Sequence, residues 1–309
     1  MNKIYSYILM SAACMCLLLL SLPAGELNGG MQVIKIFQAE KGFTIDGDLT
    51  DWTGVPEVPL QLTPDGQVLS PSSDLTVTAR FSFDARSFYA AVSVLDDRIE
   101  FPGRGRQEGD GFYLTLIHSG AEGDGGRPQI FGFSRFDNEP LAVVARRGDE
   151  TVSSVRDIQL QIRGDENKQE LTYELAIPWK YFSGLRPFLQ QKAAINLSYD
   201  DLDAGQKKVV QLVPDPDYEP ENPAPKKSLP CEFIVGPPQS LEFQSLLNAN
   251  HFYPEDERKL ELAVHSPSPQ QGWQIKLIAT TPLGNFPAEK SLSFESGLSI
   301  HTIPVEMEK

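Results

Sequence analysis

Residues 75–95 read LTVTARFSFDARSFYAAVSVL, and apolar and polar residues alternate along the first half of this stretch. Leu75 and Val77 begin a row of apolar side chains that points one way, while the residues between them point the other way. This period of two is typical of a half-buried β-strand. Residues 84–87 (DARS) predict a turn, and residues 88–95 predict a returning strand that is more fully buried. The stretch is therefore a predicted β-hairpin.

The same pattern continues through most of the chain. Further strands are predicted at residues 111–118, 130–136, 141–146, 155–163, 170–177, 193–199, 208–213 and 232–235. A sustained helical period is absent from the sequence, although Pro178 suits the first position of a short helix that ends near Leu185. Many short strands separated by Gly, Pro and Asp turns predict an all-β protein built around an antiparallel β-sandwich.

The length of 309 residues suggests about two domains. Residues 214–230 contain six prolines and are predicted as a long loop before the last strand of the first domain, with an interdomain linker as the alternative. The boundary is expected near residues 236–238 (GPP). Alternation resumes in residues 240–309, which predict a small immunoglobulin-like β-sandwich that need not be a complete domain.

The first 25 residues are predicted to be a secretory signal peptide. Lys3 supplies a positive start, residues 4–22 carry no charge, and residues 23–25 (PAG) offer small residues near a cleavage point. The protein is therefore expected to be secreted or to belong to the cell envelope. Two alternatives remain, because the apolar run is long enough for a retained membrane anchor and Cys14 permits a lipoprotein.

The net charge indicates which binding partners to expect, and the cysteine content indicates whether disulfides can form. The formal net charge of −15 repels phosphate backbones, so nucleic acid is not expected as a partner, and a membrane only if the N-terminal segment is retained. Of the three cysteines, Cys14 and Cys16 lie in the export signal. Cys231 alone remains, so the mature chain has no intramolecular disulfide.

Five short motifs occur in one order along the chain. They are FTIDGDLTDW at residues 43–52, the hairpin at 77–95 that ends in Asp96-Asp97, GDGFYLTL at 109–116, YELAIPW at 173–179, and NLSYDDLD at 196–203. Together they resemble carbohydrate-binding module family 9, over residues 33–236. The resemblance implies a twisted β-sandwich that binds sugars and is often joined to glycoside hydrolases. It therefore predicts a non-catalytic carbohydrate-binding protein associated with carbohydrate catabolism.

The resemblance also indicates where a glycan would bind. Family members that bind sugars carry a tryptophan shortly before the GD motif and a second aromatic residue late in the domain. This chain has Arg104 and Arg106 at the first place, and Tyr218 in the proline-rich loop. These three residues are the predicted rim of a site for a polysaccharide or a cell-surface glycan. The sequence does not determine which glycan binds, nor the oligomeric state of the protein.

The acidic turns suggest a structural calcium ion, a second property that the resemblance implies. Carboxylates are ligands that calcium prefers, and weak sites fill in extracellular surroundings. The candidate ligands are Asp46 and Asp48 in the first turn, with Asp96 and Asp110 elsewhere.

Three other side chains in the motifs have predicted structural roles. Trp52 is expected to plug one end of the sandwich, and Trp179 to pack on it. Glu174 is expected on a solvated strand face, with a hydrogen bond to neighbouring backbone or a cation as the alternative.

Motifs of enzymes are not found. The sequence has no G-x-S-x-G, H-E-x-x-H, C-x-x-C or phosphate-loop pattern, so no catalytic residue is predicted. One alternative to sugar binding is a structural or adhesion role in the cell envelope. Another is a haem-binding sandwich, for which His118 is the candidate axial ligand in the first domain.

Overall fold

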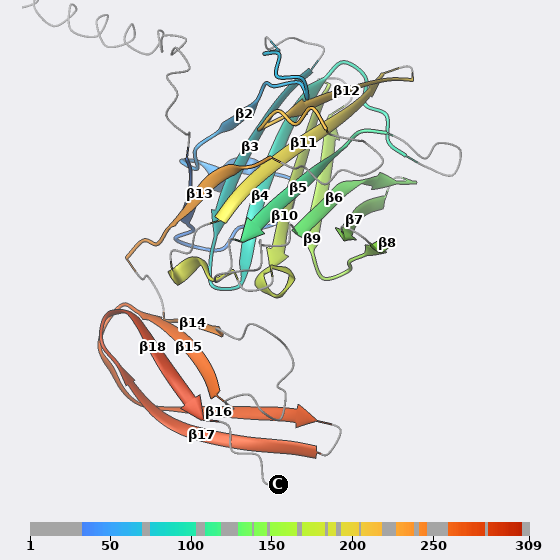
Figure 1. The fold of residues 1–309 in the computed structure, drawn as a ribbon. Helices are drawn as coiled ribbons and strands as arrows, with labels where there is room; N and C mark the ends of the chain where they lie inside the picture. Colours follow the sequence, from blue (N-terminus) through green and yellow to red (C-terminus); the bar gives the residue numbers. More distant parts are fainter. Residues whose placement is uncertain are drawn as a thin grey trace, which may run out of the picture. The chain divides into compact units, whose positions relative to one another are not determined.

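The computed structural model describes most of the chain from residue 33 to residue 304 (Figure 1). The described ranges are 33–69, 75–102, 109–118, 129–137, 139–146, 149–165, 169–182, 185–189, 193–203, 205–217, 227–237, 241–245, 259–281 and 284–304. The predicted signal peptide and the predicted rim residues Arg104, Arg106 and Tyr218 lie outside these ranges. Within them, the structure contains no helix with the length and apolarity needed to span a bilayer.

The first part of the described chain is built almost entirely from strands. They are β1 (Ile34–Gln38), β2 (Val58–Leu60), β3 (Leu75–Phe83), β4 (Ser87–Asp96), β5 (Gly111–His118), β6 (Gln129–Phe136), β7 (Glu139–Arg146), β8 (Asp149–Ser154), β9 (Gln159–Asp165), β10 (Glu170–Pro178), β11 (Ala193–Asp203), β12 (Gln206–Gln211) and β13 (Leu229–Ile234). Short 3-10 helices occur at Leu49–Trp52, Trp179–Tyr181 and Pro187–Leu189.

These strands form a continuous sheet in the order β8-β7-β6-β5-β11-β13-β1-β3-β4-β10-β9, with β2 and β12 attached to β3 and β11. Neighbours are antiparallel except at β1, which is parallel to both β13 and β3. Because β1 pairs with β13 from Ile34 to Phe37 and with β3 only at Phe37 and Gln38, it passes from one half of the sheet to the other. The predicted all-β architecture is confirmed, with two parallel pairings added.

The two halves of the sheet enclose one apolar core. It collects inward-facing residues from β3, β4, β9 and β10 on one side and from β5, β6, β11 and β13 on the other. The predicted hairpin is present, with Phe83 opposite Phe88 beside the turn. Both rings are fully buried and pack against Trp179, which confirms the predicted packing of that indole.

Two predicted elements are shorter in the structure. The helix expected from Pro178 to Leu185 is only the 3-10 turn Trp179–Tyr181, because the Trp179 indole turns into the core and its Nε1–H donates to the Asp84 carbonyl oxygen at 2.7 Å. The strand expected at residues 155–163 begins only at Gln159, after an exposed turn at Arg156 and Asp157.

The Glu174 carboxylate joins β10 to the first motif. Its Oε2 accepts hydrogen bonds from the backbone N–H groups of Asp46 (2.9 Å) and Gly47 (2.8 Å), and its Oε1 accepts from Trp52 Nε1 (2.7 Å). The side chain is fully buried, so the predicted solvated face is wrong and the alternative of a backbone partner is confirmed. Burial raises the pKa of Glu174, while these three hydrogen bonds act in the opposite direction.

This clamp places Trp52 on the outer face of the sheet. Trp52 packs with Tyr89, Ala91 and Ala176, and its ring stacks on Phe43 with centroids 4.1 Å apart. Ala91 and Ala176 face away from the main core, so Trp52 covers the flat side of β4 and β10 and does not plug an end of the sandwich as predicted. Gly47 has φ of 82°, and a Cβ there would lie 2.9 Å from Arg163 Cβ, so the turn needs glycine.

The tail contains five strands in two smaller sheets. β14 (Glu242–Ser245), β15 (Lys259–Ser266) and β18 (Gly297–Pro304) form one, while β16 (Gln270–Thr281) and β17 (Gly284–Phe294) form the other. Their core contains Leu262, Val264, Leu292, Phe294 and Ile303. The predicted β-structure of the tail is confirmed, whereas its assignment as immunoglobulin-like stays a prediction.

The first prediction concerns the clamp. Glu174→Gln replaces one acceptor oxygen by an NH2 group that faces N–H donors, so at least one buried donor loses its partner. We expect the free energy of unfolding to fall by about 2 to 4 kcal/mol, measured by urea denaturation. Glu170→Gln, at the exposed start of the same strand, is the control and should change stability by less than about 0.5 kcal/mol. Equal effects of the two substitutions would contradict the clamp.

Candidate functional site

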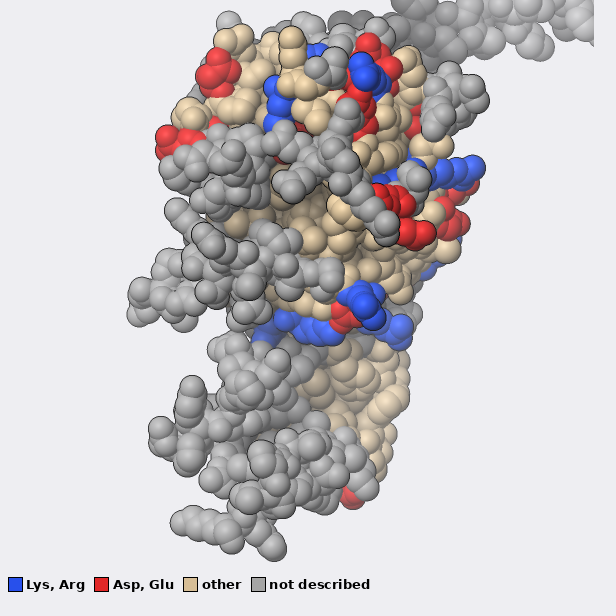
Figure 2. Space-filling model, turned by 90° about the vertical axis from the view of Figure 1, so that its right-hand side faces the viewer, with Lys and Arg blue, Asp and Glu red and all other residues tan. Residues whose placement is uncertain are grey.

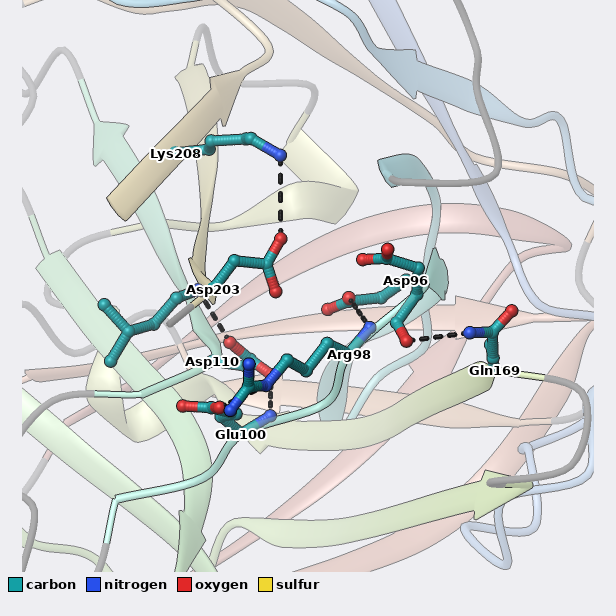
Figure 3. Close-up of polar contacts among 9 residues, drawn as sticks. Asp96, Arg98, Glu100, Asp110, Gln169, Asp203 and Lys208 are labelled. Carbon is teal, nitrogen blue, oxygen red and sulfur yellow. Dashed lines mark hydrogen bonds and ion pairs between the residues drawn. The ribbon is translucent and has the colours of Figure 1, made fainter. Parts of the chain in front are cut away.

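Several strands end or begin at one end of the first sandwich. β4 ends at Asp96, β10 begins opposite it at Glu170, β5 begins just after Asp110, and β11 ends at Asp203. Since these strands are antiparallel neighbours in the two halves of the sheet, their polar termini gather at the same end of the core (Figure 3). We call the carboxylates of Asp96, Asp201 and Asp203 the acidic triad.

The acidic triad has the spacing of a cation site. One carboxylate oxygen from each residue lies within 4.8 Å of the others. Asp201 and Asp203 are two residues apart on β11 and therefore share a face, and Asp96 and Asp201 are fully buried. Calcium binds oxygens at 2.3–2.6 Å, so two ligands of one ion are at most roughly 5 Å apart. The three carboxylates fit that requirement.

The charge of the acidic triad is partly balanced by lysine. Lys208 Nζ lies 3.6 Å from Asp203 Oδ2 (Figure 3). The neighbouring Lys207 Nζ lies 2.7 Å from Asp200 Oδ2. The other oxygen of Asp203, Oδ1, is buried and has no hydrogen-bond partner among the described residues. This oxygen remains available to a cation.

Asp110 has a different role from the triad. Its Oδ1 accepts a hydrogen bond from the Leu202 N–H at 2.9 Å, and its Oδ2 accepts one from the Glu100 N–H (Figure 3). Asp110 therefore connects the start of β5 to the end of β11. Burial is the main reason that the pKa of Asp110 rises to about 8, and the charges of Asp96 and Asp201 raise it further. Both carboxylate oxygens of Asp110 thus already accept hydrogen bonds from backbone N–H groups.

The predicted calcium ligands do not all come together. Asp46 Oδ1 accepts the Asp48 N–H at 2.9 Å, and Asp48 Oδ1 caps the following 3-10 helix by accepting the Thr50 N–H. This turn lies on the outer face of the sheet with Ala91, whereas Asp96, five residues further along β4, points to the opposite face. Only Asp96 and Asp110 lie near each other, with Asp201 and Asp203 as partners that the prediction missed.

A cavity of about 520 Å³ opens beside the acidic triad, and we call it the end cavity. Its lining combines an aromatic ring, a guanidinium, an amide and three carboxylates, namely Phe101, Arg135, Gln169, Asp96, Asp97 and Asp137. The Arg135 guanidinium lies over the Phe101 ring, 5.2 Å from its centroid, and donates to the Ile162 carbonyl oxygen. The cavity is therefore lined both by a fixed aromatic–cationic pair and by acidic groups.

Two lining residues have strained backbones. Among the described residues, the non-glycine positions with positive φ are Asp137 (50°) and Gln169 (57°), and both line the end cavity. Gln169 is held there because its Nε2 donates to the Asp97 carbonyl oxygen at 2.7 Å (Figure 3). Its backbone carbonyl oxygen also accepts a hydrogen bond from the Asp96 N–H. Such conformations cost about 1–3 kcal/mol each and tend to occur at functional sites.

The sequence held part of the signal for this site. Asp201 and Asp203 stand in the motif at residues 196–203, but only the folded strand shows that they meet Asp96. Arg135 and Gln169 carry no sequence signal, because Arg135 lies within the ordinary strand β6 and Gln169 is the residue just before β10. His118, the haem candidate, lies at the opposite end of β5 from Asp110.

Basic and acidic side chains are interspersed on the face seen in Figure 2. Elsewhere among the described residues, Lys180 and Asp157 form an ion pair.

Comparison with known proteins adds the following findings. The chain is similar to carbohydrate-binding modules of family 9. A module of this family from Caldicellulosiruptor kristjanssonii, solved with cellotriose, is 11% identical with a TM-score of 0.47, and the match covers 73% of this chain and all of that one. The same comparison finds the glucose complex from that organism (11% identity, TM-score 0.43, 65% and 95% covered) and a presumed carbohydrate-binding protein from Bacteroides uniformis (12%, 0.48, 67% and 100%). No protein-family model and no curated protein matches the chain.

The second prediction separates Asp110 from the metal ligands. Asp110→Ala leaves two buried backbone donors, those of Glu100 and Leu202, without an acceptor. We expect the free energy of unfolding, measured by denaturant titration, to fall by about 2 to 4 kcal/mol. The decrease should be the same in calcium and in chelator. Asp48→Ala removes one exposed cap and should cost about 1 kcal/mol or less. A loss at Asp110 that occurs only with calcium would instead make Asp110 a ligand.

Proposed function

We propose that this protein is an exported, non-catalytic carbohydrate-binding protein whose first domain holds a sugar in the end cavity. The observation that carries the proposal is the coincidence of the cavity with both strained residues, Asp137 and Gln169. The family 9 motifs in the sequence support the same class of ligand. An extracytoplasmic place, in the cell envelope or outside the cell, follows from the predicted signal peptide, and a contribution to glycan breakdown follows from the resemblance.

The chemistry of the end cavity suits sugar hydroxyls. A hydroxyl both donates and accepts, so it pairs well with carboxylates such as Asp97 and Asp137 and with the amide of Gln169. The volume lies within the range of about 300–1,000 Å³ that small-molecule sites occupy. The Arg135 guanidinium, held over the Phe101 ring, offers N–H donors to the hydroxyl oxygens of a sugar.

The third prediction tests sugar binding. Affinity electrophoresis on a panel of neutral polysaccharides, followed by calorimetry with oligosaccharides that include cellotriose, should show retardation and binding. Gln169→Ala removes a lining amide and keeps a side-chain Cβ at the positive φ, whereas Asp137→Gly removes a lining carboxylate and relieves the backbone strain; each should weaken binding about tenfold. Gln159→Ala, an exposed glutamine at the far end of β9, is the matched control.

A folded wild-type protein that binds no glycan at millimolar concentration would overturn the proposal. The structural or adhesion role in the cell envelope would then be the better account, because it needs the same sandwich and no ligand.

We further propose that the acidic triad binds a structural calcium ion. Three clustered carboxylates repel one another, and a divalent cation removes that repulsion only in the folded state, where Asp96 meets Asp201 and Asp203. The buried Oδ1 of Asp203, which lacks a partner among the described residues, supports the same assignment. Asp96 belongs both to the acidic triad and to the lining of the end cavity, so the proposed ion site adjoins the cavity.

The fourth prediction follows from this linkage. Calcium at a hundredfold excess over its dissociation constant would add about 2.7 kcal/mol of stability, so the melting temperature should rise by several degrees over that in excess chelator. Asp201→Asn and Asp203→Asn should abolish the shift, while Asp48→Asn should leave it intact, because Asp48 only caps a turn. Superimposable melting curves of the wild type in calcium and chelator would exclude the site.

A further inference from the structure

One tryptophan of the tail, Trp273, is exposed on the surface and not buried in the tail core. Of the chain's three tryptophans, Trp52 and Trp179 are 1% and 8% exposed, whereas Trp273 on β16 is 40% exposed. Phe243 on β14 is 36% exposed and lies beside it, with ring centroids 5.9 Å apart. We call Trp273, Phe243 and the buried Phe294 beneath them the tail aromatic cluster.

The backbone is shaped to present this indole. The pairing of β16 with β17 shifts register between Gln270 and Trp273, and Gly272 inside that bulge has φ of 72°. A Cβ on Gly272 would have open space around it, so the glycine serves the backbone conformation and not close packing. Bulges of this kind re-aim a side chain. Here the bulge sets the position of Trp273 at the edge of the core.

The two phenylalanine rings meet the indole at an angle. Trp273 meets Phe243 at 53° and Phe294 at 44°, so neither ring is stacked parallel on it. The polar side chains hydrogen-bonded next to the indole are an amide and a hydroxyl. Gln270 Oε1 lies 3.4 Å from Trp273 Nε1, and Gln270 Nε2 donates to Ser268 Oγ at 3.0 Å.

The sequence around the indole is uncharged. Residues 266–275 (SPSPQQGWQI) contain no acidic or basic residue, although charged residues make up 22% of the chain. An exposed aromatic ring bordered by amides and hydroxyls matches the C–H face and hydroxyl rim of a neutral pyranose. A charged partner would find no counter-charge in this segment.

We propose that the tail aromatic cluster is a second carbohydrate-contact site, in which a neutral pyranose ring stacks on Trp273 and bonds to the Gln270 amide. This site is independent of the end cavity. A polymer long enough to reach both sites would bind more tightly than a short oligosaccharide, because the second contact becomes intramolecular.

Acrylamide quenching of tryptophan fluorescence tests the proposal on the full-length protein, because Trp273 dominates the accessible emission. Cellohexaose or hydroxyethylcellulose at saturating concentration should lower the quenching constant by about half, whereas polygalacturonate at equal mass should leave it unchanged. A quenching constant that does not change with either neutral glycan overturns the proposal, and this measurement needs no variant.

Variants then separate the two sites. Trp273→Ala should weaken retention on hydroxyethylcellulose about tenfold, and Phe37→Ala, which removes an equally exposed aromatic ring on β1, should not. Gln169→Ala should leave the protection of Trp273 intact, so a failure at the end cavity is distinguishable from a failure here. Retention of Trp273→Ala equal to that of the wild type would contradict the second site.

Discussion

The hydrogen bonds to the Glu174 carboxylate connect parts of the chain that are 122 to 128 residues apart. A carboxylate that is fully buried is tolerated only when donors surround it, and the turn at Asp46 and Gly47 supplies two of the three. Because this turn is fixed on β10, Trp52 and Phe43 cover the outer face of β4 and β10. The other face is left to the main core, so the clamp decides which side of these strands is inside.

The division into two faces also explains the end site. Along β4, Val92 and Val94 point into the core and Asp96 continues the same row; along β11, Leu197 and Tyr199 are followed by Asp201. Both inward rows are apolar in the middle of the sandwich and acidic at its end. Carboxylates from opposite halves of the sheet therefore meet where the core stops, beside the end cavity. A cation at this point and a polar ligand next to it are consistent with the same packing.

The two proposed carbohydrate contacts differ in physical character. The end cavity is concave and rich in charged groups, and its Phe101 ring is covered by Arg135, so hydrogen bonds to hydroxyls would dominate there. The tail aromatic cluster is uncharged and open, so stacking on Trp273 would dominate. Each contact alone is expected to be weak, and a polymer would benefit from both through effective concentration.

The sequence by itself determined the all-β class, the hairpin at residues 75–95 and the motifs of the first domain, because a period of two is a local property of the chain. It also singled out Asp96 and Asp110 as acidic positions of interest. The tertiary structure alone decided that Glu174 is buried, that the turn of Asp46 and Asp48 lies on the opposite face of the sheet from Asp96, and that Asp201 and Asp203 join Asp96. These outcomes depend on which strands become neighbours, and strand order is set by contacts between residues far apart in sequence, which no local pattern records.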